Sequence, residues 1–320
     1  MTGASGRKTV LIRDTEADWY AEQFSTRCPG FDYLSATDNE TALRHAPAAQ
    51  VVIGLAPVLV PDLFAAAPRL EWVQALTTGV DNLLAMKTLK RDVTLTNCSG
   101  FHGPQMSELA FLMMLSLNRN AQRMTRNQAA RTWERWPQRL LLNKTVTILG
   151  VGAIAEELAS RCNAFGMTVT GVSDGRETVP GFARMYRRQA LHDAVATCDF
   201  LVVLTPYSPD THHIVDAGVF AAMPEHAFLI NISRGGCVDE AALLHALTNR
   251  EIAGAGLDVF ASEPLDPQDP LWSAPNVLIT PHIGGMSDIY RQQAMPLVAA
   301  NLNAYAAHGA SALNGLITRS

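Results

Sequence analysis

Three polar side chains in the second half of the 320-residue chain have the chemistry for anion binding and proton transfer. Arg234, Glu263 and His282 each lie within a few residues of the end of a separate short apolar run. A guanidinium binds planar carboxylates through paired hydrogen bonds. A histidine exchanges protons near neutral pH, and a neighbouring carboxylate favours its protonated form. Because ligands of open α/β sheets bind beyond the carboxyl ends of the strands, the three could meet at one ligand.

A glycine-rich string, GVGAIA at 150–155, lies between an apolar run and a helical segment. Gly150 permits a tight turn, and Gly152 lets the backbone approach a pyrophosphate. The first N–H groups of the helix, near Ala153 and Ile154, would face the phosphates, since a helix N-terminus carries partial positive charge. The string and its context predict a bound dinucleotide.

The end of the next apolar run, about 20 residues on, bears on the choice between NAD and NADP. An acidic residue there would hold the ribose hydroxyls and oppose a 2′-phosphate, whereas an arginine would attract one. Ser173 occupies the usual acidic position, Asp174 follows it, and Arg176 comes two residues later. Asp174 favours NAD, while Ser173 and Arg176 leave NADP open.

Two series of short apolar runs alternate with helical stretches along the chain. The expected strands are 10–12, 51–54 and 72–76 in the first series, then 145–149, 168–172, 199–205, 228–231, 255–259 and 277–280. Helices are expected at about 14–27, 104–120 and 288–308. Alternation of this kind predicts an α/β protein with two doubly wound parallel sheets and a boundary near residue 100.

The composition narrows the classes of partner. The formal net charge is −5, with 25 basic and 30 acidic residues, and this balance disfavours a nucleic-acid binder. The longest apolar stretch is too short to span a bilayer, and the first residues lack the apolar core of a signal peptide, so we expect a soluble, cytoplasmic protein.

The cysteines and histidines give no sign of a metal site. Five cysteines without a CxxC pair suit a reducing compartment, and no Cys or His spacing matches a zinc site. The adjacent pair His212 and His213 is expected to point to opposite sides of an extended segment. We therefore predict no metal.

Taken together, these strings closely resemble the D-isomer-specific 2-hydroxyacid dehydrogenase family. The likeness runs from about Leu76 to Gly285 and includes the string 78–81, TGVD, and the segment 103–108. It implies a flavodoxin-like substrate domain made of 1–99 and 287–320, with a Rossmann-type NAD(P) domain, 100–286, inserted into it. It also implies an active site in the interdomain cleft and a homodimer.

The resemblance assigns roles to the polar trio. Arg234 would bind the substrate carboxylate and polarise the C2 carbonyl, together with the backbone N–H groups of Gly79 and Val80. His282 would donate a proton to the forming alkoxide, and Glu263 would orient the imidazole. Taken singly, each of the three could be a surface charge, a helix cap or a structural histidine.

The resemblance also assigns residues to the cofactor. The Asp258 carboxylate and the Ile232 carbonyl would hold the nicotinamide carboxamide, and Pro206 would line the adenosine side. His282 and Gly284 would lie beside the dinucleotide as well.

The function that fits best is hydride transfer between NAD(P)H and C2 of a small 2-keto or 2-hydroxy acid, with glyoxylate and hydroxypyruvate as the preferred substrates. A phosphoglycerate dehydrogenase fits less well, because no regulatory domain is expected after the last helix. A phosphite dehydrogenase, or an NAD(H)-sensing protein like the corepressors built on this fold, would share the trio and stay alternatives.

Overall fold

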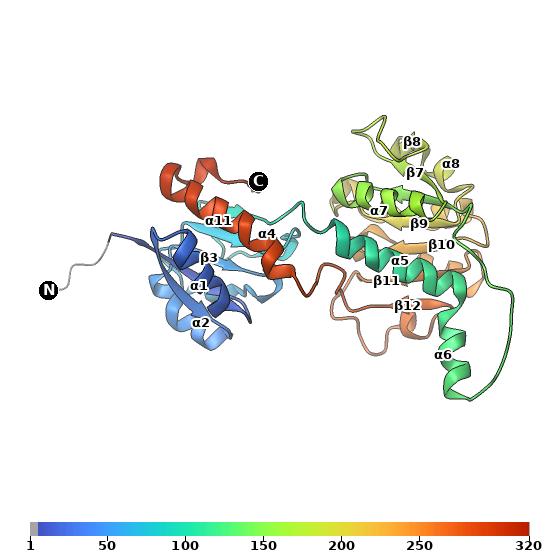
Figure 1. Cartoon of the computed structure of the whole chain (residues 1–320), viewed down its shortest axis with the longest axis horizontal. Helices are drawn as coiled ribbons and strands as arrows, with labels where there is room; N and C mark the ends of the chain where they lie inside the picture. Colours follow the sequence, from blue (N-terminus) through green and yellow to red (C-terminus); the bar gives the residue numbers. More distant parts are fainter. Residues whose placement is uncertain (1–5, 320) are drawn as a thin grey trace. The chain divides into compact units, whose positions relative to one another are not determined.

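The computed structural model describes residues 6–319, which divide into two compact units (Figure 1). One unit contains the described residues up to Phe101 together with those from Asp288 on, and the other is His102–Ser287. The second unit is therefore an insertion in the chain of the first. Among residues 6–319, no helix has both the length and the apolar character needed to cross a membrane.

The first unit is built on a five-stranded parallel sheet in the order β2-β1-β3-β4-β5, the flavodoxin-like order. Helices cover both of its faces, and a separate apolar cluster fills the space under each. Its strands are β1 (Lys8–Arg13), β2 (Phe31–Ala36), β3 (Val51–Gly54), β4 (Trp72–Ala75) and β5 (Thr94–Thr96). Its helices are α1 (Ala17–Arg27), α2 (Asn39–His45), α3 (Pro61–Ala65), α4 (Asp81–Ala85) and α11 (Tyr290–His308), with 3₁₀ turns η1 (Ala46–Ala48), η2 (Ala56–Val58) and η7 (Ala310–Ala312).

The second unit is built on a seven-stranded parallel sheet in the order β12-β11-β10-β9-β6-β7-β8. Its strands are β6 (Thr145–Leu149), β7 (Thr168–Val172), β8 (Arg184–Tyr186), β9 (Phe200–Val203), β10 (Phe228–Asn231), β11 (Gly254–Leu257) and β12 (Val277–Ile279). Its helices are α5 (Gly103–Arg119), α6 (Ala121–Ala129), α7 (Ala153–Ala164), α8 (Leu191–Val195), α9 (Ala217–Ala222) and α10 (Glu240–Thr248). The 3₁₀ turns are η3 (Arg188–Ala190), η4 (Pro209–Thr211), η5 (Gly235–Cys237) and η6 (Pro270–Ser273).

Strand order in the second unit reverses direction between β6 and β9, which lie side by side although β7 and β8 separate them in the chain. Helices α5 and α7 pack on one face, and α8, α9 and α10 pack on the other (Figure 1). This is the doubly wound Rossmann arrangement, in which the reversal opens a crevice beyond the carboxyl ends of the strands. The glycine-rich string follows β6, so it lies at this point.

The predicted fold class, two doubly wound parallel sheets with an inserted Rossmann-type domain, is confirmed. Four strands, β3, β6, β7 and β10, have the predicted bounds. The helix expected from residue 14 begins instead at Ala17, because Asp14 forms a turn in which its Oδ1 accepts the N–H of Glu16 at 2.8 Å. Strands β2, β5 and β8 have no counterpart among the strands expected from the sequence, and each lies at an edge of its sheet.

Candidate active site

A histidine–glutamate pair lies beyond the carboxyl ends of β11 and β12. Nδ1 of His282 lies 2.7 Å from Oε2 of Glu263. Because an ionised carboxylate only accepts hydrogen bonds, Nδ1 donates here and Nε2 is directed elsewhere. The other carboxylate oxygen, Oε1, accepts the N–H of Phe260 at 3.0 Å, so the Glu263 side chain is fixed at both oxygens. The imidazole is 46% exposed, which leaves it open to a ligand.

The hydrogen bond between His282 and Glu263 shifts the pKa values of both side chains in the directions that favour an ion pair. The hydrogen bond to Glu263 raises the pKa of His282 above its ordinary value, against burial, which lowers it. Burial alone would raise the pKa of Glu263, but hydrogen bonds from His282 and from the Phe260 N–H bring it below its ordinary value. The imidazole therefore keeps a proton to higher pH than an isolated histidine would, which suits a proton donor.

Arg234 lies on the loop after β10, and this loop is pressed against the one that carries Glu263. A Cβ on Gly235 would fall 1.8 Å from the carbonyl carbon of Phe260, so only glycine permits the approach. Asn231, the last residue of β10, holds the Arg234 loop: its buried amide donates to the Arg234 carbonyl at 3.1 Å. The positive charge of Arg234 reaches the pair, since it lowers the pKa values of both Glu263 and His282.

Two acidic residues position these loops, and this role of theirs could not be predicted from the sequence. The Ala261 N–H donates to Oε1 of Glu240, at the start of α10, at 2.7 Å. Asp258, 1% exposed, accepts three hydrogen bonds from the His282 loop. The donors are the Thr280 hydroxyl at 2.6 Å, the Ile283 N–H at 2.9 Å and the Gly284 N–H at 2.9 Å.

Asp258 was predicted to hold the nicotinamide carboxamide. A carboxylate has about four acceptor positions, so the three bonds leave one for such a contact. The loop needs this anchor, because His282 has a left-handed backbone conformation, φ +54°. The cofactor role of Asp258 stays a prediction, and its role in holding the His282 loop is a finding.

The glycine-rich string fits a dinucleotide. Gly150 has φ +94°, and a Cβ there would fall 2.5 Å from the Thr205 nitrogen, so the turn requires glycine. A Cβ on Gly152 would meet nothing within 4 Å, which leaves open space above the start of α7. No side chain caps this helix, so its first N–H groups, at Ala153 and Ile154, face outward at its positive end.

The loop after β7 holds the residues predicted to contact the adenosine ribose. Ser173 donates its N–H to the Tyr186 carbonyl at 2.9 Å. Asp174 accepts the N–H of Arg188 at 2.8 Å and faces the Arg188 guanidinium at 3.3 Å. Arg176 pairs with Glu156 in the first turn of α7. The loop is thus tied both to η3 and to the helix of the glycine-rich string.

The remaining predicted residues follow the ends of three strands, β9, β10 and β4. Pro206 is exposed on the loop after β9, and Ile232 is buried with its side chain in the core under α5 and α7. Gly79 and Val80 belong to the first unit, before α4, where the Gly79 carbonyl accepts the Thr77 hydroxyl at 2.7 Å. Their substrate contact stays a prediction.

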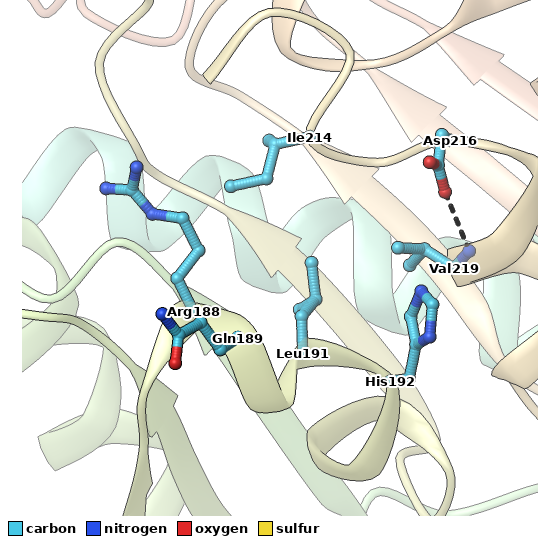
Figure 2. Close-up of a pocket in the computed structure, with 7 residues that line it drawn as sticks. All are labelled: Arg188, Gln189, Leu191, His192, Ile214, Asp216 and Val219. Carbon is cyan, nitrogen blue, oxygen red and sulfur yellow. Dashed lines mark hydrogen bonds between the residues drawn. The ribbon is translucent and has the colours of Figure 1, made fainter. Parts of the chain in front are cut away.

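A small hollow of about 180 Å³ lies beside the loop after β7, and none of the predicted site residues lines it. Figure 2 shows it between the start of α8 and the segment that leads into α9. Its lining residues are Arg188, Gln189, Leu191, His192, Ile214, Asp216 and Val219.

The expectation for the histidine pair was wrong in its geometry. The rings of His212 and His213 stack with centroids 3.8 Å apart instead of pointing to opposite sides. His213 has φ +51°, and this left-handed backbone replaces the extended one on which the expectation rested. In the described part of the chain, no group of three or more metal-ligating side chains comes together.

Known proteins resemble this chain in sequence and in fold. The family described as "D-isomer specific 2-hydroxyacid dehydrogenase, NAD binding domain" matches residues 111–284, more than half of the chain. A glyoxylate reductase of Pyrococcus horikoshii is 32% identical over 253 residues, which cover 76% of this chain and 75% of that protein.

Two solved structures extend the match to nearly the whole chain. A D-isomer specific 2-hydroxyacid dehydrogenase family protein from Aeromonas salmonicida has a TM-score of 0.91 and 31% identity, and the match covers 98% of this chain and all of that one (100%). An NADPH-dependent glyoxylate/hydroxypyruvate reductase from Sinorhizobium meliloti, in complex with NADP and sulfate, has a TM-score of 0.82 and 27% identity over 98% of this chain and 99% of that one.

The sheet order, the glycine turn after β6 and these matches agree with one another, and the NAD(P)-binding domain is the one inserted within the chain. The chain belongs to the D-isomer specific 2-hydroxyacid dehydrogenase family and is an NAD(P)-dependent enzyme of that family.

Proposed function

We propose that this enzyme reduces small 2-keto acids of the glyoxylate and hydroxypyruvate type to the D-2-hydroxy acids. The observation that carries the proposal is the His282–Glu263 hydrogen bond at 2.7 Å, together with the close packing of the Glu263 loop against the loop that bears Arg234. An imidazole–carboxylate pair and a guanidinium thus lie beyond strand ends of the NAD(P)-binding domain, which supports a role for them in proton donation and carboxylate binding. Relatives named for glyoxylate and hydroxypyruvate reduction support the choice of substrate.

Arg234, His282 and Glu263 each have a separate role in the proposed reduction. Nicotinamide, when bound, supplies the hydride that reaches C2. Arg234 binds the substrate carboxylate and draws electron density toward the carbonyl oxygen, as a planar guanidinium can. The protonated Nε2 of His282 gives its proton to the C2 oxygen as that oxygen gains charge, and Glu263 holds the ring and stabilises its positive form. The reverse reaction uses the same groups, with His282 as the base.

Other residues would bind and orient. The start of α7, with Gly150, Gly152, Ala153 and Ile154, would hold the pyrophosphate, because its N–H groups are uncapped and the space above Gly152 is open. At the nicotinamide end, the carboxamide would contact the fourth acceptor position of Asp258 and the carbonyl of Ile232, with Gly284 alongside.

Further proposed contacts lie outside this core. Pro206 would line the adenosine side, and Ser173, Asp174 and Arg176 would lie at the ribose. The N–H groups of Gly79 and Val80 would bind the substrate carboxylate together with Arg234. We further propose a homodimer in the cytoplasm, where the five free, buried cysteines would stay reduced.

The test is a matrix of NADH and NADPH against glyoxylate, hydroxypyruvate, pyruvate and 2-ketogluconate, scored by kcat/KM. We expect the highest values with glyoxylate and hydroxypyruvate. Arg234→Lys should raise KM for glyoxylate at least tenfold, because an ammonium cannot make the paired planar contact. Turnover that is unaffected by Arg234→Lys, or turnover with phosphite alone, would reject the proposal.

A further inference from the structure

The acidic residue nearest the predicted ribose position is already engaged. Asp174 favours NAD only if its carboxylate can accept the ribose hydroxyls. In the structure, one of its oxygens accepts the Arg188 N–H at 2.8 Å, and the other faces the Arg188 Nε at 3.3 Å. The carboxylate is thus turned toward η3, and the charge it would present to a 2′-phosphate is balanced by a guanidinium.

The same contact orients the Arg188 guanidinium. Its Nε faces Asp174, so the two terminal nitrogens, Nη1 and Nη2, are left to donate, and neither has a hydrogen-bond partner in the described part of the chain. Figure 2 shows this guanidinium on the side of the hollow away from His192 and Asp216. A guanidinium held at one edge and free at the other suits paired hydrogen bonds to a phosphate.

Two further arginines border the loop. Arg176 pairs with Glu156, and Arg187 pairs with Glu177, in both cases between side chains at least one-third exposed. Exposed ion pairs of this kind contribute little to stability, so a phosphate carrying nearly two negative charges can compete for these cations.

The neutral residues leave room for such a group. Ser173 stands at the position where an acidic side chain would repel a 2′-phosphate, and its N–H is tied to the Tyr186 carbonyl, which leaves the hydroxyl to donate. A Cβ on Gly175 would meet nothing within 4 Å.

We propose that Ser173 and Arg188, with Arg176 beside them, form a 2′-phosphate site, and that the enzyme therefore prefers NADP(H) to NAD(H). The inference rests on the dinucleotide site proposed above and specifies which cofactor that site selects. It reverses the preference that Asp174 indicates from sequence alone, because Arg188 occupies that carboxylate.

Binding to the cofactor-free protein tests the inference without catalysis. Isothermal titration calorimetry with NADPH and NADH should give a Kd for NADPH at least tenfold lower, since hydrogen bonds between a guanidinium and a phosphate are stronger than those between neutral groups. Adenosine 2′,5′-bisphosphate should bind measurably tighter than 5′-AMP. Equal affinity within each pair, or tighter binding of NADH, would overturn the inference.

Three variants test which residues are responsible for the preference for NADPH. Arg188→Gln should weaken NADPH binding roughly tenfold or more, with little change for NADH, because NADH carries no 2′-phosphate for the guanidinium to bind. Ser173→Asp should lower the NADPH affinity and raise that for NADH. Arg184→Gln is the matched control: it removes a charge from exposed β8, where the guanidinium stacks on Tyr186, and should alter neither affinity. Losses in Arg184→Gln equal to those in Arg188→Gln would show a general charge effect and overturn the proposed site.

The outcomes separate this inference from the proposed function. Tight NADPH binding without turnover of any keto acid would leave the 2′-phosphate site standing and reject the proposed reaction. Keto-acid turnover with NADH, and Kd values that favour NADH, would do the opposite.

Discussion

Replacing Asp258 should destabilise the second unit and misplace His282. The carboxylate is buried and accepts two backbone N–H groups and one hydroxyl from the His282 loop. In Asp258→Ala the Thr280 hydroxyl can rotate, but the two N–H groups cannot find other partners. The buried Gly284 N–H should cost about 1–3 kcal/mol and the part-buried Ile283 N–H about 0.5–1.5 kcal/mol, which together give roughly 1.5–4.5 kcal/mol.

The assay is thermal unfolding of the cofactor-free protein by calorimetry. At about 2–4 °C per kcal/mol for a domain of this size, the melting temperature should fall by several degrees. The melting temperature of Asp258→Asn should fall less than that of Asp258→Ala. The asparagine keeps one oxygen to accept from Ile283 and Thr280, and only the Gly284 N–H loses its acceptor, because it then faces an amino group. The kcat for glyoxylate should fall in both variants, since the loop that carries His282 is no longer fixed.

Asp210→Ala is the matched control, because Asp210 is exposed on η4 and accepts no hydrogen bond from the described residues. Its melting temperature should stay within about 1 °C of the parent. If Asp258→Ala melted within the same interval, the three hydrogen bonds would not anchor the loop, and the account of how His282 is positioned would be refuted.

Three further predictions concern the reaction and the cofactor. His282→Asn should lower kcat by about 10²–10⁴-fold while the Kd for NADPH stays within twofold, measured by stopped-flow kinetics and calorimetry; unchanged kcat would remove His282 from the chemistry. Glu263→Gln should move the alkaline fall of kcat/KM in the reduction direction to lower pH. The hydrogen bond to Glu263 raises the pKa of His282, so without it the proton needed for reduction is lost earlier as pH rises; an unmoved pH profile would contradict this. Gly152→Ala should melt at the parent temperature, because its Cβ has open space, yet bind NADH and NADPH at least tenfold more weakly; unchanged affinity would place the pyrophosphate elsewhere.

The buried strands of the fold could be predicted from sequence, whereas three of the four edge strands could not. Central parallel strands are covered on both faces and read as unbroken apolar runs, as in Phe200–Val203. Edge strands have a neighbour on one side only, and their side chains are partly exposed. Phe31–Ala36 and Arg184–Tyr186 therefore carry polar residues and show no such run. The start of α1 was missed because a side-chain turn at Asp14 delays the helix.

For the site, the sequence identified the residue types but not their contacts. Glu263 and His282 are 19 positions apart, and their hydrogen bond depends on two loops meeting, which spacing alone does not determine. The contact between Asp174 and Arg188 could not be predicted from the sequence either, because the two residues are 14 positions apart and a further strand lies between them. The one signal that could have revealed the loop contact is Gly235 itself, a glycine placed where a backbone must approach closely.

The close approach of Gly235 to Phe260 limits how this enzyme can be redesigned. Because the peptide that follows Arg234 lies directly against the peptide chain that leads to Glu263, the two segments cannot be lengthened, shortened or re-angled one at a time. An engineer seeking a new substrate should leave both turns intact and vary loops that do not share this contact. A change in the backbone of either turn would require a matching change in the other, which a single substitution does not supply.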